Sequence, residues 1–501
     1  MCLGGIALSE KSLKQKVAIG TVWVLLLRFA LRGIGLISTM ILARILLPED
    51  YGLIALGYSV YTFIEMLAAF GFDMVLVQKA KLERSDYDSA WTARLICYTV
   101  LAVVFVGLAD VASAFYNEPR LTPIIYVLGV QMFLRGLENM ALVDFRRELM
   151  FDKEFKYKVS IKIIGFCVTI PLAFYLQNYW ALLWGTIVSK VASVALSYYF
   201  RPYMPSICFE KTREIMDFSK WLLFTNIAQF FRSQLPNIML GKYVSSGAVG
   251  IYSIGTEIAR FSSQELVAAM NRPVYSGFAK LKQNKEELVK NYLEVVGFQA
   301  FVVLPMGFGL AATSDYAVRV ILGSNWLSVI EPISILAISV ALSSISSCCQ
   351  YIYLVSGKPK LPFTISLFGL AIFAPQVLLF TEKYGLMGVV YAHFVSNTLT
   401  AMLNFWMVSR TLQISLQKIV SVLLRPFLGA LAMVYVLSYW LMPELLGVVS
   451  NPLVGLLIVV PVGAAIYALL TFGFWLAQGK PESPEHLAIR MLREKLLKRF
   501  A

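Results

Sequence analysis

Two arginines one helical turn apart, Arg28 and Arg32, lie in the middle of a long apolar segment near the N-terminus. A charged side chain at the centre of a hydrocarbon layer is costly, so such a residue is a functional candidate by default. No acidic residue lies within one turn of either arginine in the sequence. Guanidinium groups form paired hydrogen bonds with phosphate. The two arginines therefore predict a site for a phosphate-bearing anion.

Other apolar segments also carry central polar or charged residues. Those that could bind the same anion or a polar group attached to it are Arg135, Lys190, Asn226, Gln229, Arg232 and Arg260. Together with Arg28 and Arg32, the cations of this set number six. The apolar segments also carry four central carboxylates, Glu65, Glu138, Glu257 and Glu265. This surplus favours an anionic ligand. The alternative is structural, because Arg135 with Glu138 and Glu257 with Arg260 have the i,i+3 spacing of helical ion pairs.

Three of the carboxylates, Glu65, Glu138 and Glu257, are candidates for coupling transport to an ion. A carboxylate at membrane depth can exchange a proton when its surroundings alternate between wet and dry. A proton or a sodium ion is therefore a candidate partner.

The patterns of catalytic and cofactor-binding proteins are missing from the sequence. It has no nucleophile elbow, phosphate-cradling loop or HExxH helix, and only two histidines. We expect no catalytic residue, no metal site and no cofactor. Gly33 and Gly35 are expected to permit close helix packing instead of binding phosphate. The net charge of +14 does not indicate nucleic acid, since the basic residues lie mostly in short loops between apolar runs.

The segments that must position these residues are membrane-spanning helices. Of the 501 residues 58% are hydrophobic and 15% charged, whereas soluble domains have about 25% charged residues. Runs of about 20 apolar residues, enough to cross a bilayer, recur along the whole chain. The sequence predicts an all-α polytopic membrane protein with about fourteen helices, at 17–42, 52–77, 91–114, 122–143, 159–177, 179–200, 217–241, 249–274, 292–313, 328–355, 361–381, 385–408, 419–442 and 453–477.

The distribution of basic residues predicts the orientation of these helices. With a cytoplasmic N-terminus, 29 of the 44 lysines and arginines fall on the inner side and five in the outer loops. Inner loops of membrane proteins are enriched in these residues. Both termini are therefore expected in the cytoplasm.

An internal repeat with an offset of 198 residues predicts two related halves. Leu42-Ala43-Arg44 followed by Gly52-Leu53 aligns with Leu240-Gly241-Lys242 followed by Gly250-Ile251. Duplicated halves around a central cavity are typical of transporters. We expect a first lobe over 1–204 (helices 1–6), a second over 205–410 (helices 7–12), two further helices over 411–478, and a basic tail over 479–501. The tail has an amphipathic pattern that either lies on the inner leaflet or is simply solvated.

The stretch from Ala43 to Leu53 (ARILLPEDYGL) resembles the outer turn between the first two helices of bacterial polysaccharide flippases. These are exporters of lipopolysaccharide and capsule biosynthesis, within the multidrug/oligosaccharidyl-lipid/polysaccharide exporter superfamily. Further similar stretches are 71–79, 145–151, 250–253 and 322–326, and the resemblance covers most of 15–410. It departs at Leu235-Pro236-Asn237, where relatives often carry an acidic residue, so no ion-coupling role is assigned there.

The resemblance implies two six-helix lobes in a V-shaped arrangement, with two appended C-terminal helices, in the cytoplasmic (inner) membrane. It implies a cargo of polyprenyl-pyrophosphate-linked oligosaccharide, moved from the inner to the outer leaflet. Membrane lipids and other polysaccharide-assembly proteins are further candidate partners. The alternative is a cation-coupled exporter of drugs or small solutes from the same superfamily. A membrane glycan polymerase is disfavoured because the outer loops are short.

Overall fold

The computed structural model describes residues 3–67, 76–77, 79, 82–211, 220–444 and 451–477. Throughout these ranges the regular structure is helical, and no strand occurs in them. The chain divides into two compact units, Met1–Gly250 and Ile251–Ala501, and each is described by itself. This agrees with the all-α class expected from the sequence.

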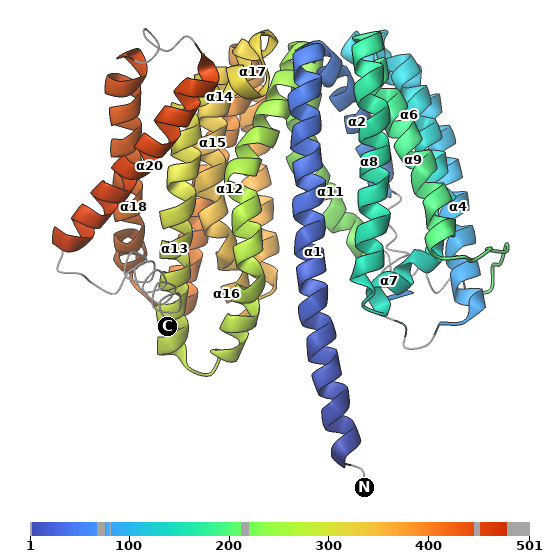
Figure 1. The fold of residues 1–501 in the computed structure, drawn as a ribbon, viewed down its shortest axis with the longest axis horizontal. Helices are drawn as coiled ribbons and strands as arrows, with labels where there is room; N and C mark the ends of the chain where they lie inside the picture. The colour runs from blue at the N-terminus through green and yellow to red at the C-terminus, as the bar shows by residue number, and fades with distance from the viewer. Residues whose placement is uncertain are drawn as a thin grey trace. The chain divides into compact units, whose positions relative to one another are not determined.

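The first unit is a bundle of helices, most of them long (Figure 1). Helices α8 and α9 pack together, α1 packs on α8, and α4 packs on α6. The elements are α1 (Leu3–Ile45), α2 (Pro48–Leu67), α4 (Arg84–Gly107), α5 (Ala109–Tyr116), α6 (Leu121–Gly136), the 3-10 turn η1 (Met140–Val143), α7 (Asp144–Arg147), α8 (Phe151–Leu176), α9 (Trp180–Phe200) and α11 (Lys220–Tyr243).

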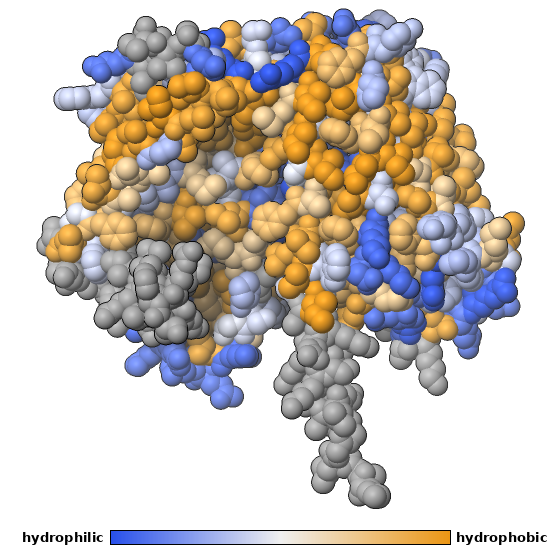
Figure 2. Space-filling model, viewed as in Figure 1, coloured by the Kyte–Doolittle hydropathy of each residue, from blue (hydrophilic) through white to orange (hydrophobic). Residues whose placement is uncertain are grey.

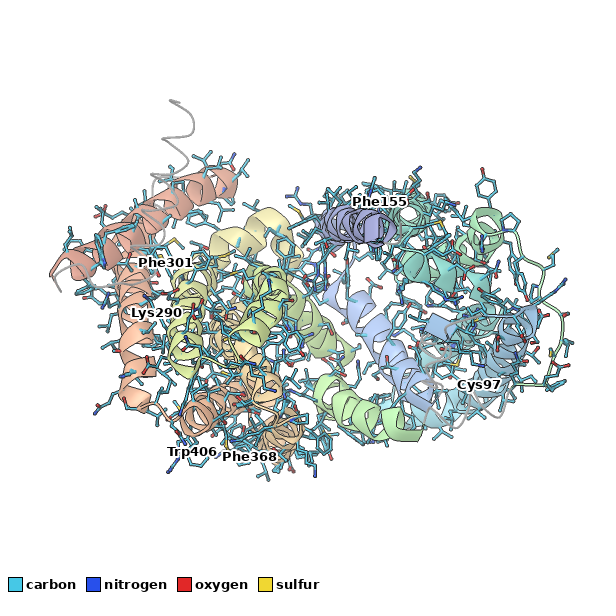
Figure 3. All side chains as sticks on the ribbon, turned by 90° about the horizontal axis from the view of Figure 1, so that it is seen from below. Cys97, Phe155, Lys290, Phe301, Phe368 and Trp406 are labelled. Atoms are coloured by element: carbon cyan, nitrogen blue, oxygen red, sulfur yellow. The ribbon has the colours of Figure 1, made fainter. Side chains whose placement is uncertain are left out.

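Two features of this bundle show why the sequence folds this way locally. Between α8 and α9, Gln177 adopts a left-handed conformation with φ of 51°, and α8 ends just before it, close to the predicted end of the segment 159–177. On the side of α1, Trp23 packs against Phe155 of α8 with 5.2 Å between the ring centroids. Figure 3 labels Phe155 at this contact.

The second unit is built around α13, which packs against α15 and α18. Tyr292 and Tyr353 are fully buried in its core. The final long helix crosses α18 obliquely (Figure 1), and its Tyr467 packs against Phe301 of α13 at 5.7 Å between centroids. The elements are α12 (Ser246–Lys280), which begins in the first unit, α13 (Lys285–Ala312), α14 (Ser314–Ile321), η2 (Ser324–Val329), α15 (Ile330–Ile345), η3 (Ser346–Cys348), α16 (Cys349–Val355), α17 (Lys360–Leu412), α18 (Leu416–Val436), the π-turn η4 (Leu437–Leu441) and α20 (Pro452–Ala477).

Each of the fourteen apolar segments expected from the sequence contains helix where it is described. The segments 361–381 and 385–408 fall on the single long α17, which is interrupted at Gly385 by a left-handed φ of 57°. In the described part of the chain, nine helices are long and apolar enough to cross a membrane. The number of crossings, fourteen, stays a prediction.

The surface of each unit suits a hydrocarbon environment. Hydrophobic residues cover much of the middle of both units, and polar residues gather toward their ends (Figure 2). Phe29, Val103 and Leu469 are 68%, 68% and 74% exposed, which would be unusual for so many large apolar side chains in water. The chain is a membrane protein with multiple apolar helices.

Candidate functional site

A chain of charged residues runs through the interior of the first unit. Arg135, near the end of α6, forms an ion pair with Glu65 of α2. Its guanidinium also lies over the ring of Tyr98 in α4, 5.5 Å from the ring centroid. The pairing joins α2 to α6, and the aromatic ring stabilises the cation further. Both residues had been expected at a site, Arg135 for substrate and Glu65 for ion coupling.

A second ion pair lies next along this chain of charges. The Lys190 ammonium of α9 is 2.7 Å from a carboxylate oxygen of Glu138, and the same oxygen accepts a hydrogen bond from Ser193 at 2.7 Å. The two charged side chains are only 16% and 18% exposed. Arg94 of α4 donates to the backbone carbonyl of Glu138 and is 8% exposed. These three cations and two carboxylates lie in two groups, the Arg135–Glu65 pair and Glu138 with Lys190 and Arg94. We call the two groups together the Arg94–Lys190 network (Glu65, Arg94, Arg135, Glu138 and Lys190).

These partners differ from the i,i+3 pairing of Arg135 with Glu138 that the sequence allowed as a structural alternative. The reason is the early end of α6, which stops at Gly136. Glu138 therefore no longer follows the helical path that would place it one turn from Arg135. Its carboxylate is free to meet Lys190 on α9 instead.

The chain beyond α6 is irregular, and its backbone groups are held by α9. Tyr198 donates to the carbonyl of Leu137 at 2.8 Å. Asn139 donates through its backbone N–H to Ser197 Oγ at 3.1 Å and through its side chain to the carbonyl of Arg201 at 2.7 Å. Irregular backbone at membrane depth is tolerated only where protein buries it or where it lines a wet cavity.

A cavity of about 290 Å³ opens beside this irregular segment, within the first unit. Its walls come from α4, the segment between α6 and α8, α8 itself and α9. The lining residues are Arg94, Glu138, Asn139, Met140, Leu142, Val143, Phe145, Arg146, Glu154, Tyr157, Lys158, Ile161 and Ser193. The Arg94–Lys190 network therefore borders an open space through Arg94 and Glu138.

The other expected site residues lie on three further helices. Arg28 is half-buried and Arg32 is exposed on α1, while Arg232 is half-buried on α11. Glu257 and Arg260 have exposed side chains on α12. The side chains of Asn226 and Gln229 lie outside the described residues. Their gathering into a single site stays a prediction.

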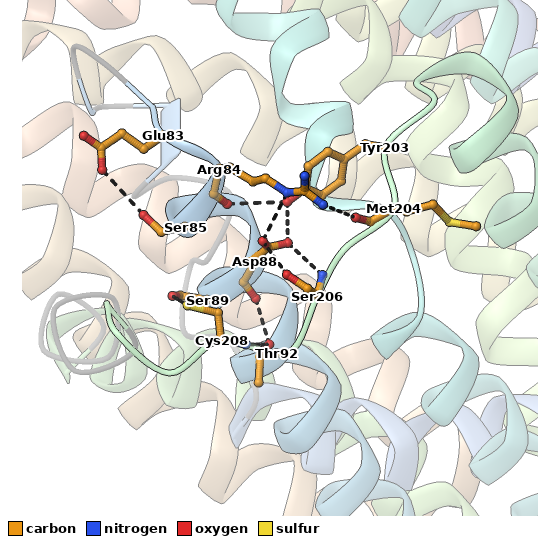
Figure 4. A network of polar contacts seen from close by, with 10 residues as sticks. All are labelled: Glu83, Arg84, Ser85, Asp88, Ser89, Thr92, Tyr203, Met204, Ser206 and Cys208. Carbon is orange, nitrogen blue, oxygen red and sulfur yellow. Dashed lines mark hydrogen bonds and ion pairs between the residues drawn. The ribbon is translucent and has the colours of Figure 1, made fainter.

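The start of α4 is tied to the connector that follows α9 (Figure 4). Asp88 accepts hydrogen bonds from the hydroxyl of Tyr203 and from the backbone N–H and hydroxyl of Ser206, the latter two at 2.8 and 2.7 Å. Farther along the connector, Lys211 lies 2.7 Å from Glu83, and this contact lowers the pKa of the Glu83 carboxyl. The connector thus fixes the helix that carries Arg94.

Arg94 is the member of the network that sequence reasoning missed. Its expected helix began at 91, where a cation lies at the membrane surface. The structure begins α4 at Arg84, so Arg94 lies ten residues, or about 15 Å, along the helix. A sequence signal for this start exists, because Glu83 and Asp86 form a capping box.

Comparison with known proteins places this geometry in a family. The model of a polysaccharide biosynthesis protein family matches residues 41–331, more than half of the chain. The "Lipopolysaccharide biosynthesis protein WzxC" of Escherichia coli (strain K12) is 22% identical over 436 residues, covering 86% of this chain and 85% of that protein. The "Succinoglycan biosynthesis transport protein ExoT" of Rhizobium meliloti (strain 1021) is 23% identical over 456 residues, covering 89% and 91%.

Solved structures with a similar fold are transporters. The "Lipid II flippase MurJ" in an inward closed conformation has a TM-score of 0.72 at 13% identity, covering 92% of this chain and 99% of that one. An inward-facing multidrug resistance transporter of the MATE family has a TM-score of 0.59, also at 13% identity, covering 77% and 95%. At this identity the likeness concerns the fold. The family match over 41–331 shows that the chain belongs to the polysaccharide biosynthesis protein family.

Proposed function

We propose that this protein moves an oligosaccharide carried on polyprenyl pyrophosphate from the inner to the outer leaflet of the cytoplasmic membrane. The cargo would supply the assembly of a cell-surface polysaccharide. Support comes from the family match and from the two relatives, one named for lipopolysaccharide biosynthesis and one for succinoglycan transport. A lipid II flippase has a similar fold, so this architecture suits the transfer of a lipid across a membrane.

The observation that carries the proposal is the surplus of positive charge inside the membrane-embedded helices. The Arg94–Lys190 network has three cations and two carboxylates, and α1 adds Arg28 and Arg32. Positive charge at this depth favours an anionic head group. An exporter of cationic drugs, the second candidate function, is better served by an acidic cavity.

In this proposal the arginines of α1, α11 and α12 hold the pyrophosphate, and Asn226 and Gln229 face the sugars. Arg135 and Lys190 also belong to the proposed substrate set. Each already faces a carboxylate, so it contacts cargo only when that carboxylate is exchanged for the pyrophosphate. The polyprenyl chain stays in the surrounding lipid, and the two proposed lobes, 1–204 and 205–410, alternate in exposing the site.

The carboxylates Glu65, Glu138 and Glu257 are the proposed sites of ion coupling. Protonation of Glu65 or Glu138 would break its ion pair with Arg135 or Lys190, which links proton binding to a rearrangement of the network. Each is replaced by Gln and transport is measured from about pH 6 to pH 8. A variant that keeps the pH response of the unaltered protein is not the coupling site.

A reconstituted transport assay tests the proposed function. The purified protein is placed in vesicles that contain a fluorescent polyprenyl-pyrophosphate oligosaccharide in one leaflet. We expect transfer to the opposite leaflet, competition by unlabelled lipid-linked oligosaccharide, and no uptake of a cationic dye. Dye transport without transfer of the lipid-linked sugar would instead support the drug exporter.

A further inference from the structure

The cavity of the first unit lies beside a broken helix and has charged walls. Its lining comes from α4, the segment between α6 and α8, α8 and α9, and none of its lining residues belongs to α1. It therefore differs from the proposed pyrophosphate site of the arginines on α1, α11 and α12, although it shares Glu138 with the proposed ion-coupling residues. Breaks in membrane helices are where transporters commonly bind ions or polar groups.

The mouth of the cavity carries two cations that share one carboxylate. Arg146 Nε lies 3.2 Å and Lys158 Nζ 2.6 Å from the same oxygen of Glu154. The side chain of Glu154 is 11% exposed, whereas those of Arg146 and Lys158 are 54% and 35% exposed. One carboxylate balances only one of the two positive charges.

The floor of the cavity also carries charged groups. Arg94 and Glu138 line it, and Lys190 lies directly behind Glu138 at 2.7 Å. Lys190 pairs with the Glu138 carboxylate, whereas Arg94 donates to the backbone carbonyl of Glu138. The residues that line the cavity include three cations, Arg94, Arg146 and Lys158, and two carboxylates, Glu138 and Glu154. A cleft lined mainly by one sign of charge attracts a ligand of the opposite sign.

The hydrogen-bonding groups of the wall suit a phosphate. Besides the guanidinium and ammonium groups, the hydroxyls of Tyr157 and Ser193 line the cavity and lie 3.0 Å apart. Charge-assisted bonds from such donors to phosphate oxygens are among the strongest in proteins. A volume of about 290 Å³ is at the lower end of ligand pockets, so it holds a head group and not an oligosaccharide.

We propose that this cavity binds the phosphate group of a small anionic molecule, with Arg146 and Lys158 at the entrance and Arg94 at the floor. The source is either the head group of an anionic phospholipid or a soluble phosphate compound. Arg146 and Lys158 belong to a segment predicted on the inner side of the membrane, where anionic lipids are abundant. The proposal concerns binding alone and does not depend on the transported cargo.

Two sets of charge variants test the site on the full-length protein. Arg146→Gln with Lys158→Gln removes the entrance cations. The matched control, Lys153→Gln with Lys156→Gln, removes two exposed lysines of α8, the helix of Lys158, that do not line the cavity. Glu154→Gln removes the entrance carboxylate and keeps both cations. If the cavity binds phosphate, the first set weakens binding, the control leaves it unchanged, and Glu154→Gln strengthens it.

Binding is measured with two probes that separate the sources. Inorganic pyrophosphate is titrated into detergent-purified protein by calorimetry, and retained phosphatidylglycerol is counted by native mass spectrometry after extraction from phosphatidylglycerol–phosphatidylcholine nanodiscs. We expect binding to weaken about tenfold for each cation that is replaced. If the double variant binds more weakly, the control equally and Glu154→Gln more tightly with pyrophosphate alone, the ligand is a soluble phosphate compound. If the variants rank in this way with phosphatidylglycerol alone, the ligand is a lipid. If the two double variants behave alike and Glu154→Gln binds neither probe more tightly, the cavity holds only water and the proposal is wrong.

Discussion

Gly52 and Gly250, separated by 198 residues, lie in reciprocal contact at the two turns of the internal repeat. A Cβ atom on Gly52 would lie 1.6 Å from the carbonyl oxygen of Ser246, and one on Gly250 would lie 1.9 Å from the carbonyl oxygen of Pro48. Ser246 follows Pro48 by the same 198 residues, so the contact is symmetric. The repeat seen in the sequence therefore corresponds to two equivalent turns that pack backbone to backbone.

We expect Gly52→Ala and Gly250→Ala each to destabilise this contact severely. A methyl group at either position meets backbone atoms that have no rotamer to change, so the cost should exceed the roughly 1–3 kcal/mol typical of overpacked cores. The matched control is Gly33→Ala on α1. Folded protein in the membrane and its thermal midpoint in detergent are measured for all three variants.

The surroundings of Gly33 differ from what the sequence predicted. Gly33 and Gly35 were expected to permit close helix packing, yet no described atom outside the local helix lies within 4 Å of a Cβ placed at either. That expectation is wrong for this structure. Gly33→Ala should match the unaltered protein or gain stability, because alanine favours the helix by about 1 kcal/mol. A Gly52→Ala variant as stable as Gly33→Ala would contradict the backbone contact between the two turns.

The buried pair of Glu138 and Lys190 gives a second prediction. Lys190→Gln removes the ammonium partner of the Glu138 carboxylate, whose side chain is only 18% exposed. Removing one partner of a buried ion pair lowers the free energy of unfolding by about 3–5 kcal/mol. Glu138→Gln should cost a comparable amount, since it leaves the ammonium unbalanced. The double variant should recover much of this stability, because two neutral amides can hydrogen-bond to each other. Denaturation of the four proteins in detergent gives the coupling energy, and additive effects would show that the pair contributes nothing.

How far the sequence predicts the structure depends on the type of signal. Helix positions follow from long apolar runs, and the break at Gly385 falls on the first residue of the predicted segment 385–408. The partners of the charged residues could not be predicted in this way. They depend on where α6 ends, and nothing in the apolar pattern through Gly136 marks that end. The misplaced start of α4 had a readable signal in Glu83 and Asp86, because a capping box there would have placed Arg94 inside the helix and not near its end.

The pH dependence of stability should reflect an ion pair between α5 and α6. Arg120 binds Glu118 through two hydrogen bonds of 2.7 and 2.8 Å, and this contact lowers the pKa of the Glu118 carboxyl from its usual 4.5. A lowered folded-state pKa means that the stabilisation is present above about pH 4.5 and is lost as the pH falls through the folded value. Glu118→Gln should therefore lower the thermal midpoint at pH 7 and have little effect at the acid end.

Arg120→Gln is the matched partner variant, and it should show the same convergence with the unaltered protein on acidification. Thermal midpoints are compared at steps from neutral pH to below pH 4. A constant difference between Glu118→Gln and the unaltered protein across this range would contradict a role for the charged pair.

The orientation in the membrane is a further prediction, based on the excess of basic residues on one side. Reporter domains fused after Ser12 and at the C-terminus should both report a cytoplasmic location. A reporter in the turn that contains Glu118 should report the opposite side, because α5 and α6 meet there. Opposite readings from the two termini would require an odd number of crossings and would contradict the predicted fourteen.

The two arginines of α1 give the sharpest prediction about cargo. A single cation at the bilayer centre costs on the order of 2.5–3.5 kcal/mol on insertion scales, so a ligand or residues on other helices must compensate Arg28 and Arg32. One acidic candidate for this role, Glu65, is paired with Arg135 in the structure. If pyrophosphate is the main counter-ion, replacing both arginines with Gln should abolish transport while the amount of inserted protein stays the same or increases.

Lysine variants separate the geometry of the guanidinium from its charge. Arg28→Lys or Arg32→Lys keeps the positive charge but removes the planar fork that binds phosphate through two hydrogen bonds, so transport should fall although insertion is normal. Membrane-inserted protein and transfer of the lipid-linked sugar are measured on the same samples. Disappearance of the double Gln variant from the membrane would assign the arginines to structural pairing within the protein. If the variant with both arginines replaced by Gln is abundant in the membrane and fully active, neither arginine holds the cargo. Loss of both guanidinium groups would otherwise slow the transfer of the pyrophosphate-linked sugar.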